Sequence, residues 1–404
     1  MPYREFRRAC PLWATYTKVT SPWRQELGYT APMRAEFPSA EKNELLRRLA
    51  KDPRSKKLHQ ERPKPPSEPP SRFKRVASRG NDWGLTRTMP RYRIERDTSL
   101  GGKATKWSVR ADTSTDDFFI AKFGNKNGRV EVMTELFNNQ LGEALGFTMA
   151  HSGVARLDEH LYFLTRNFRR NEALVHGSLL IVEIFSAKED VDHIGHDFEQ
   201  SFYTVTFMQE VIQHYCGKSA CSVFEKFIEM LVFDALIGSM DRHAMNWGVL
   251  RSEFVDEDGK QGMRLAPIFD SARALLWDLP EGRLLKLDAD PDALWQYVSS
   301  SKPCIGPEPD HPKVNNCNHF EFFESLLRIY PHPTSTAYAK ICVDVCGIAR
   351  RLLAQFPFNR AFSPLRKRLI LKVLALRADG LRRIFEEGGA RDVGNEVFHT
   401  TANA

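Results

Sequence analysis

The stretch GSMDRHAMNWGVL, residues 238–250, follows a strongly apolar run and gathers four polar side chains within six residues. These side chains are Asp241, Arg242, His243 and Asn246. The apolar run has the length of a helix, so the polar group falls where that helix is expected to end. Two interpretations are open: a polar loop that caps the helix, or the working part of an active site.

Composition places the chain among ordinary globular proteins. Of its 404 residues, 42% are apolar and 27% are charged, and the length allows two or three structural units. No run reaches the roughly 20 apolar residues of a membrane helix, and the first residues lack the apolar core of a secretory signal. The seven cysteines are scattered, which favours reduced thiols over a disulfide framework. We therefore expect a cytoplasmic protein without a transmembrane segment.

Positive charge is concentrated at the start of the chain. Residues 1–90 hold 20 Lys and Arg against 9 Asp and Glu, whereas the remainder holds 38 against 42. The segment 51–80 is rich in proline and basic residues and poor in large apolar ones, so it cannot offset its ordering entropy by burial. A largely disordered basic extension is predicted, with a short helix at 39–51. It is either a solvated extension or an arm that binds nucleic acid or an acidic surface.

The pattern changes near residue 91. Alternating apolar residues predict strands at 91–97, 107–112, 117–123, 149–157 and 160–168, and helical spacing predicts a helix at 128–147. Later helices are predicted at 202–216, 222–238, 319–330, 336–356 and 365–388. The fold class is therefore α+β, with a small antiparallel sheet and one helix followed by a mostly helical part. The expected boundaries are an extension 1–90, a sheet region 91–170, a helical region 171–390 and a tail 391–404.

Two features upstream could bind phosphate. In SLGGKATK, residues 99–106, Gly101 and Gly102 let the backbone approach a phosphate and Lys106 adds charge, although a plain glycine hairpin also fits. Lys122 ends an apolar strand and needs a partner there, such as a nucleotide phosphate and a carboxylate of the next helix. Glu135 is the candidate and Glu131 the alternative; otherwise Lys122 reaches water from an edge strand.

The remaining polar residues suit phosphoryl transfer. Asp241 could accept the proton of an attacking hydroxyl, and Asn246, five positions later, could supply an oxygen to Mg²⁺. His243 is expected to brace this loop by hydrogen bonds, and Arg242 to meet a phosphate or a carboxylate. Asp270 ends the apolar run LAPIFD at 265–270, where a carboxylate can be the main Mg²⁺ ligand or merely a turn former.

Glycine turn, strand lysine, helix glutamate, Asp–x4–Asn loop and strand-end aspartate follow one another in the order found in protein kinases. Residues 93–385 resemble the HipA-like serine/threonine kinases of bacteria, which have a two-lobed protein-kinase-like fold. The stretch GSMDRHAMNWGVL is similar to that family's N-x-D-x-H-x-K-N-x-S motif, and LAPIFD to its L-x-P-x-Y-D strand. SLGGKATK, TELFNNQLGEALGF and YFLTRNFRR resemble its glycine loop, its helix after the ATP lysine and its hinge.

The resemblance implies ATP and Mg²⁺ as cofactors and assigns roles by position. Asp241 would be the catalytic base beside His243, while Asn246 and Asp270 would hold Mg²⁺. The implied ATP-binding positions are Gly101, Gly102, Lys106, Lys122 and its partner Glu135, with the backbone of Thr165, Asn167 and Phe168 receiving the adenine. Ser99 and Thr105 of the glycine loop are implied sites of self-phosphorylation, which would add negative charge beside the ATP phosphates.

The implied partners are a protein substrate and an antitoxin-like protein. The chain departs from the motif at Ser239, Met245, Asn167 and Arg169, and a basic leader replaces the N-terminal subdomain of the toxin-type members. A shorter branch that includes secreted effector-like kinases fits better, which makes secretion an alternative to the cytoplasm.

Two other functions stay open. One is a lipid kinase, since DRHAMN also matches the D-R-H-x-x-N loop of phosphoinositide kinases. The other is a nucleotide-holding pseudokinase or binding module with a nucleic-acid-binding arm.

Overall fold

The computed structural model describes nine segments of the chain: residues 92–96, 106–111, 118–124, 128–157, 160–167, 172–184, 203–255, 261–308 and 317–400. The predicted extension at 1–90 and its helix lie outside the described residues. The same is true of the glycine turn up to residue 105 and of residues 401–404. The predicted boundaries between the regions stay predictions.

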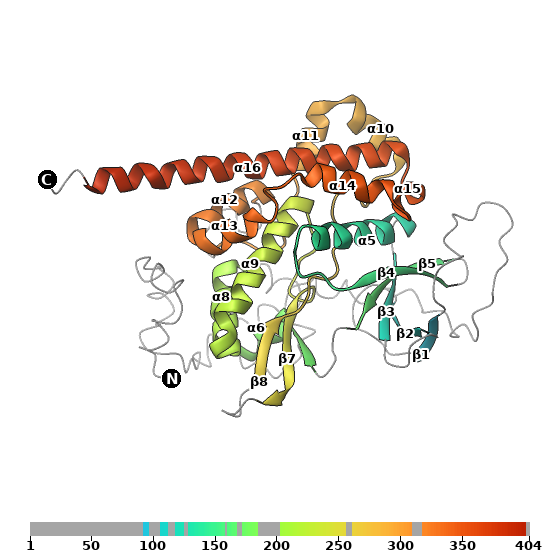
Figure 1. Ribbon diagram of the computed structural model, residues 1–404, viewed down its shortest axis with the longest axis horizontal. Helices are drawn as coiled ribbons and strands as arrows, with labels where there is room; N and C mark the ends of the chain where they lie inside the picture. Colours follow the sequence, from blue (N-terminus) through green and yellow to red (C-terminus); the bar gives the residue numbers. More distant parts are fainter. Residues whose placement is uncertain are drawn as a thin grey trace, which may run out of the picture. The chain divides into compact units, whose positions relative to one another are not determined.

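A five-stranded antiparallel sheet comes first in the described chain (Figure 1). In spatial order its strands are β1 (Tyr92–Arg96), β2 (Lys106–Ala111), β3 (Phe118–Phe123), β5 (His160–Arg166) and β4 (Ser152–Leu157). Trp107, Val109, Ala121, Ala155 and Leu164 form a buried cluster on this sheet. Successive side chains of a strand point to opposite faces, so Trp107 and Val109, two positions apart, share the buried face. Because β3 has a neighbour on each side, Lys122 does not lie on an edge strand.

One helix, α5 (Arg129–Ala144), packs against β4 and β5 (Figure 1). Its residues Val132, Met133, Leu136 and Phe137 are almost completely buried. Their spacing of three and four positions puts them on one side of the helix. The helix thus presents Glu135, which lies within this buried group, toward the interior rather than toward water.

The rest of the described chain is mostly helical and also holds a second antiparallel sheet of three strands in the order β6–β7–β8. These strands are β6 (Glu172–His176), β7 (Gly248–Val255) and β8 (Gln261–Leu265). The helices are α6 (Gly177–Ile184), α8 (Val205–Cys216), α9 (Ala220–Ile237), α10 (Glu281–Ala289), α11 (Pro291–Ser299), α12 (His319–Ile329), α13 (Pro331–Ala339), α14 (Val345–Ala354), α15 (Phe358–Ala361) and α16 (Pro364–Thr400).

Helix α9 is the central helix of this part. It is apolar on nearly every side, and helices α8, α12, α13 and α16 all pack against it. A helix that is hydrophobic all round needs such complete cover. The predicted α+β arrangement, a small antiparallel sheet with one helix followed by a larger helical part, is therefore confirmed.

The helix predicted at 336–356 is wrong as a single element. The chain instead forms α13 and α14, with a turn between them. The side chain of Asp344 accepts a hydrogen bond from the backbone N–H of Gly347 at 2.7 Å and caps the start of α14. An N-terminal cap of this kind begins a new helix because it satisfies a donor that a continuous helix would have used internally.

Candidate active site

Lys122 lies between two carboxylates from distant parts of the chain. Its amine is 3.1 Å from the Glu135 carboxylate on α5, and it also contacts the carboxylate of Asp270. Its side chain is only 12% exposed, so it does not reach out to water. The carboxylate on α5 that pairs with the strand lysine is therefore that of Glu135, the expected candidate.

The charged groups around Lys122 shift one another's pKa values. Burial alone would lower the pKa of Lys122, but the carboxylates of Asp270 and Glu135 outweigh it and raise that pKa above its usual range. Burial would raise the pKa of Asp270, yet the nearby amines of Lys122 and Lys106 hold it well below its usual range. Burial raises the pKa of the Glu135 carboxyl, against the attraction of Lys122. Lys122 and Asp270 are thus a charged pair in a largely water-excluded place.

Asp270 is held in place by the backbone on either side of it. Its φ angle of 58° lies in the left-handed region, which a short polar side chain such as Asp tolerates better than most. Before it, Ile268 forms an isolated parallel bridge with Met149, next to the five-stranded sheet. After it, the carbonyl of Ser271 accepts a hydrogen bond at 2.8 Å from Asn138 of α5. Between these two contacts, the Asp270 carboxylate meets Lys122 of β3. The strand predicted through 265–270 is present only as the bridge at Ile268.

The polar loop at 241–246 begins where α9 ends. Gly238, in the left-handed conformation with φ of 68°, closes the helix. The side chain of Asn246 then donates a hydrogen bond at 2.6 Å to the backbone carbonyl of Asp241. His243 accepts one at its Nδ1 atom from the Met245 N–H at 3.3 Å, so it braces the loop as expected.

Asp241 itself has a partner that the sequence did not suggest. Its carboxylate accepts a hydrogen bond at 3.1 Å from the guanidinium of Arg273, three residues after Asp270. Both side chains are partly exposed. Arg273 therefore connects the loop after α9 to the segment that carries Asp270.

Arg242 also connects the loop after α9 with the segment of Asp270. It is fully buried and pairs with Asp234 of α9, so of its two expected partners it meets a carboxylate. Its Nη1 atom donates both to the carbonyl of Asn246 at 2.7 Å and to that of Phe269 at 2.5 Å. Because one nitrogen serves both carbonyls, Asn246 and the residue before Asp270 lie side by side.

The predicted adenine site lies at the end of β5. Thr165 pairs with Ile120 of β3. The backbone N–H of Asn167 donates a hydrogen bond to the carbonyl of Phe118 at 2.7 Å. Phe168 lies outside the described residues. The N–H of Asn167 is thus used within the fold, and the role of this segment toward adenine stays a prediction.

Lys106 of the predicted glycine loop starts β2, where its Cα is the register partner of Lys122. The other candidate residues of this loop, Ser99, Gly101, Gly102 and Thr105, lie outside the described residues. The position of Lys106 is consistent with its electrostatic effect on Asp270.

A metal at this site would need help from a ligand. The described part of the chain contains no group of three or more His, Cys, Asp and Glu side chains that could hold a metal ion. Asp270 and Asn246 supply hard oxygen donors, which suit Mg²⁺, but Mg²⁺ prefers six such ligands. The residues present fit a Mg²⁺ ion that brings phosphate oxygens and water with it, as in nucleotide sites.

Asp234, Arg273 and Asn138 are the contributors that sequence reasoning missed. A signal existed for Asp234, because it is the one charged residue in the apolar stretch 230–237 of α9, and a carboxylate there needs a buried partner. Arg273 and Asn138 gave no such signal, since their partners are 32 and 133 positions away.

Comparisons with known proteins place the chain in a family. The sequence model described as the HipA-like C-terminal domain matches residues 98–305, which is half of the chain. The chain belongs to this family. The matched segment holds all the residues of the lysine and loop groups described above.

Two of the matches carry the name CtkA and come from Helicobacter pylori. The serine/threonine-protein kinase CtkA (strain J99) is 30% identical over 125 residues, which make up 30% of this chain and 36% of CtkA. The alignment thus spans little more than a third of this relative's length. The crystal structure of a Helicobacter pylori proinflammatory kinase CtkA matches with a TM-score of 0.54 and 17% identity, over 74% of this chain and 96% of that one. The shared two-lobed kinase-like fold is therefore confirmed.

A more distant match is the toxin–antitoxin complex of HipA, HipB and operator DNA from Shewanella oneidensis MR-1. It has a TM-score of 0.37 and 13% identity, over 71% of this chain and 65% of that one. This likeness is too low to support an inference about the present chain. Among the helices of the described residues, none combines the length and the apolar character needed to cross a bilayer.

Proposed function

We propose that this protein is an ATP- and Mg²⁺-dependent serine/threonine protein kinase of the HipA-like type. The observation that carries the proposal is the position of the Lys122 amine, held between Glu135 of α5 and Asp270 of a distant segment. A buried cation beside two carboxylates, next to a polar loop that offers a base and an amide oxygen, suits the binding of a nucleotide triphosphate and the transfer of its phosphoryl group.

The lysine and its partners would bind the nucleotide. Lys122 binds the phosphates, and Glu135 keeps its amine in the direction of the site. Asp270 and Asn246 hold Mg²⁺, which neutralises charge on the phosphate oxygens. The amine of Lys122 also contacts Asp270, so it partly neutralises this carboxylate.

Asp241 would accept the proton during transfer. The hydroxyl oxygen of the acceptor forms a bond to the γ-phosphorus while the bond from that phosphorus to the β–γ bridging oxygen breaks, and ADP leaves with the bonding electron pair. The hydroxyl proton passes to the Asp241 carboxylate. Arg273 fixes the direction of this carboxylate through the 3.1 Å hydrogen bond. His243 acts on the loop and not on the proton.

Other parts of the proposal rest on the family resemblance. The backbone of Thr165, Asn167 and Phe168 receives adenine, and the glycine loop with Gly101, Gly102 and Lys106 covers the phosphates. Ser99 or Thr105 accepts a phosphate in the same protein, which lowers activity by charge repulsion with ATP. An antitoxin-like protein is the proposed regulatory partner, and the basic segment 1–90 is the proposed contact for an acidic surface or nucleic acid.

Transfer of labelled γ-phosphate from ATP with Mg²⁺ tests the proposal. The wild type should label itself or a mixture of bacterial proteins, and Asp241→Asn should reduce the rate by about 10²–10⁴-fold while the nucleotide still binds. Asp270→Asn should weaken binding of Mg·ATP and abolish labelling. Asp288→Asn, in an exposed ion-pair group with Arg368 and Lys372, is the matched control and should keep full activity.

The same assay separates the alternatives. Label on phosphoinositide-containing vesicles, with none on protein, would replace the protein kinase by a lipid kinase. Nucleotide binding without label on any acceptor would leave a binding module. Full activity in both Asp241→Asn and Asp270→Asn would contradict the site itself.

A further inference from the structure

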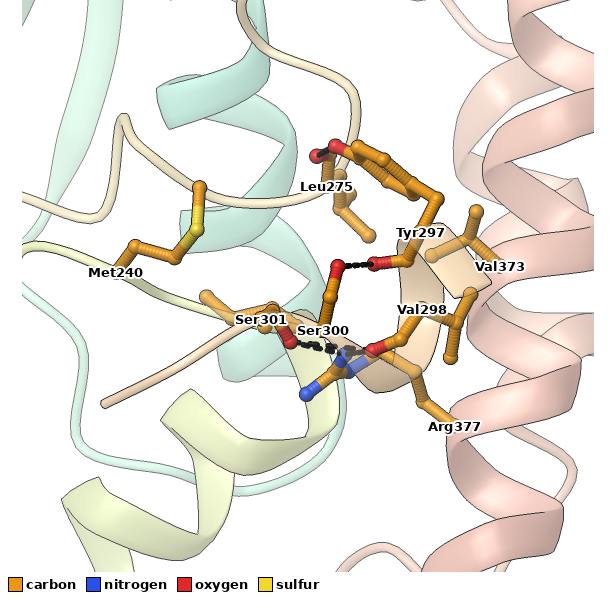
Figure 2. A pocket seen from close by; sticks show the side chains of 10 residues that line it. Met240, Leu275, Tyr297, Val298, Ser300, Ser301, Val373 and Arg377 are labelled. Carbon is orange, nitrogen blue, oxygen red and sulfur yellow. Dashed lines mark hydrogen bonds between the residues drawn. The ribbon is translucent and has the colours of Figure 1, made fainter. Parts of the chain in front are cut away.

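A buried arginine of α16 contacts the end of α9, just before the loop of Asp241. Arg377 of α16 is 1% exposed. It donates to the carbonyl of Ala235 from Nε at 2.9 Å and from Nη2 at 2.7 Å. From Nη1 it donates to the carbonyl of Val298 at 2.9 Å and to the Ser301 hydroxyl at 2.8 Å, the pair of contacts drawn in Figure 2.

These acceptors explain how the charge is tolerated. Ala235 is in the last turn of α9 and Val298 in the last turn of α11, where helix carbonyls are unpaired and the helix dipole is negative. None of the described hydrogen bonds of Arg377 goes to a carboxylate. The guanidinium therefore ties the ends of two helices together instead of forming an ion pair.

The end of α9 leads straight into the loop. A Cβ atom at Gly238 would lie 3.0 Å from both Cζ and Nη1 of Arg377, so the guanidinium touches the backbone at the point where the helix closes. The next two residues are held by other side chains. The Ser239 carbonyl accepts from Nε2 of His319 at 2.9 Å, and the Met240 carbonyl from the thiol of Cys304 at 3.0 Å.

The three residues before Asp241 are thus each contacted by a side chain from another part of the chain. Arg273 in turn binds the carboxylate of Asp241 itself. Two of the contacting residues, His319 and Arg377, lie outside the segment 98–305 that matches the family. A support that works through bonds of fixed geometry can affect a rate strongly, because a shift of about 1 Å at a reacting group can cost about 100-fold.

We propose that Arg377 is a positioning residue: it fixes the end of α9 and thereby the place of the Asp241 carboxylate, so phosphoryl transfer depends on a guanidinium supplied by the C-terminal helix. This inference rests on the proposed role of Asp241. It makes α16 part of the working enzyme and not only a cover for α9. The contact would be needed for the rate of transfer and not for nucleotide binding, because Lys122, Glu135 and Asp270 are held by other contacts. Asn246 is also held separately, since Arg242 donates to its carbonyl at 2.7 Å.

A second arginine of the same helix provides a matched control. Arg366 is also buried and donates to backbone carbonyls, but its acceptors are Leu276 at 2.7 Å and Leu279, and its ion pair is with Glu281. It supports the start of α10 and makes no contact with 238–241 among the described hydrogen bonds. Lysine at either position keeps the charge and removes the fork of donors.

A cavity of about 70 Å³ adjoins Arg377 and allows a second readout (Figure 2). It is lined on its other sides by Met240, Leu275, Tyr297 and Val373 among others. Arg377 itself lines this cavity, so removal of its side chain in Arg377→Ala would enlarge it. Added guanidinium can therefore return to the place of the missing group and restore the contacts with the helix ends.

The experiment compares Arg377→Lys and Arg366→Lys by amide hydrogen exchange and by kinetics. We expect faster exchange at 238–246 in Arg377→Lys only, with kcat lowered by about 100-fold and the KM for ATP within about threefold. In Arg366→Lys, faster exchange should be confined to 276–284 and kcat should stay near that of the wild type. Millimolar guanidinium, far below denaturing concentrations, should raise kcat of Arg377→Ala and leave Arg366→Ala unchanged.

Equal losses of kcat in the two lysine variants, or unchanged exchange at 238–246 in Arg377→Lys, would overturn the proposal. Ser301→Ala, which removes one acceptor only, repeats the exchange test if both Arg377 variants fail to fold. It should speed exchange at 238–246, and no change there would also count against the proposal. If the wild type transfers no phosphate to any acceptor, the proposed function fails, while the exchange comparison still decides whether Arg377 holds the loop.

Discussion

Arg242 donates hydrogen bonds from Nε and Nη2 to both carboxylate oxygens of Asp234, at 2.8 and 3.0 Å, and neither side chain is more than 3% exposed. The remaining donors of Arg242 reach the carbonyls of Asn246 and Phe269 and the hydroxyl of Ser271. One buried guanidinium thus connects α9, the polar loop and the segment of Asp270. The fork of an arginine is suited to this task because its donors are fixed in one plane.

Removal of the carboxylate from this pair should destabilise the whole fold. In Asp234→Asn, Arg242 keeps a buried charge without its counter-charge, which typically costs about 3–5 kcal/mol. Urea unfolding followed by circular dichroism measures the change in the free energy of unfolding. The control is Asp379→Asn, which breaks the exposed pair with Arg382 and should cost at most about 1 kcal/mol. Similar midpoints for the two variants would show that the buried pair is not a main support.

Glu135 and Glu131 offer a test of the lysine pair within one helix. Glu135→Gln removes the charge that holds Lys122 at 3.1 Å but keeps the side chain's size, so we expect a folded protein. Its kcat/KM for ATP should fall about 10- to 100-fold, because the lysine loses its orientation toward the phosphates. Glu131→Gln, one turn earlier on α5, should have kcat/KM within about threefold of the wild type. The reverse order of the two effects would transfer the role to Glu131.

Arg273 should affect transfer and not nucleotide binding. Arg273→Gln frees the Asp241 carboxylate to rotate, so we expect kcat to fall by about tenfold with the dissociation constant of Mg·ATP unchanged. Arg273→Lys, which keeps a charge near Asp241, should recover part of the rate. Arg264→Gln, in an exposed ion pair with Glu172, serves as the control and should leave kcat unaltered. A loss of ATP affinity in Arg273→Gln would argue that Arg273 contacts the nucleotide instead.

Local patterns in the sequence predicted much of the fold. Period-two and period-3.6 spacing located the five strands of the first sheet and α5, α8, α9 and α12. They failed where a single residue decides, as at Asp344, whose cap divides the predicted helix 336–356 into two. They also did not reveal the strands β6, β7 and β8, whose residues do not alternate clearly.

The site divides in the same way. Lys122, Asp241, Asn246 and Asp270 could be named as candidates because polar residues at the ends of apolar elements are unusual and their order matches a known layout. The groups that hold them could not. Arg377 and Ala235 are 142 positions apart, and an arginine in an amphipathic helix looks the same in sequence whether it faces water or two helix ends.

Acid should destabilise the protein through His319, and the sign follows from its burial. Burial, with the nearby charge of Arg377, lowers the pKa of His319 well below 6.5, while Nε2 still donates to the Ser239 carbonyl. Below about pH 6.5 the unfolded chain takes up a proton that the folded protein refuses, so stability falls by up to about 1.4 kcal/mol per pH unit. Above that pH both states are neutral at this residue and the effect vanishes.

His319→Gln keeps a donor but cannot titrate, so urea midpoints measured between pH 7 and 5 should fall less steeply than in the wild type. Parallel slopes for the two proteins would assign the acid sensitivity to other groups. His332→Gln, in α13, gives the slope expected when a different histidine is removed.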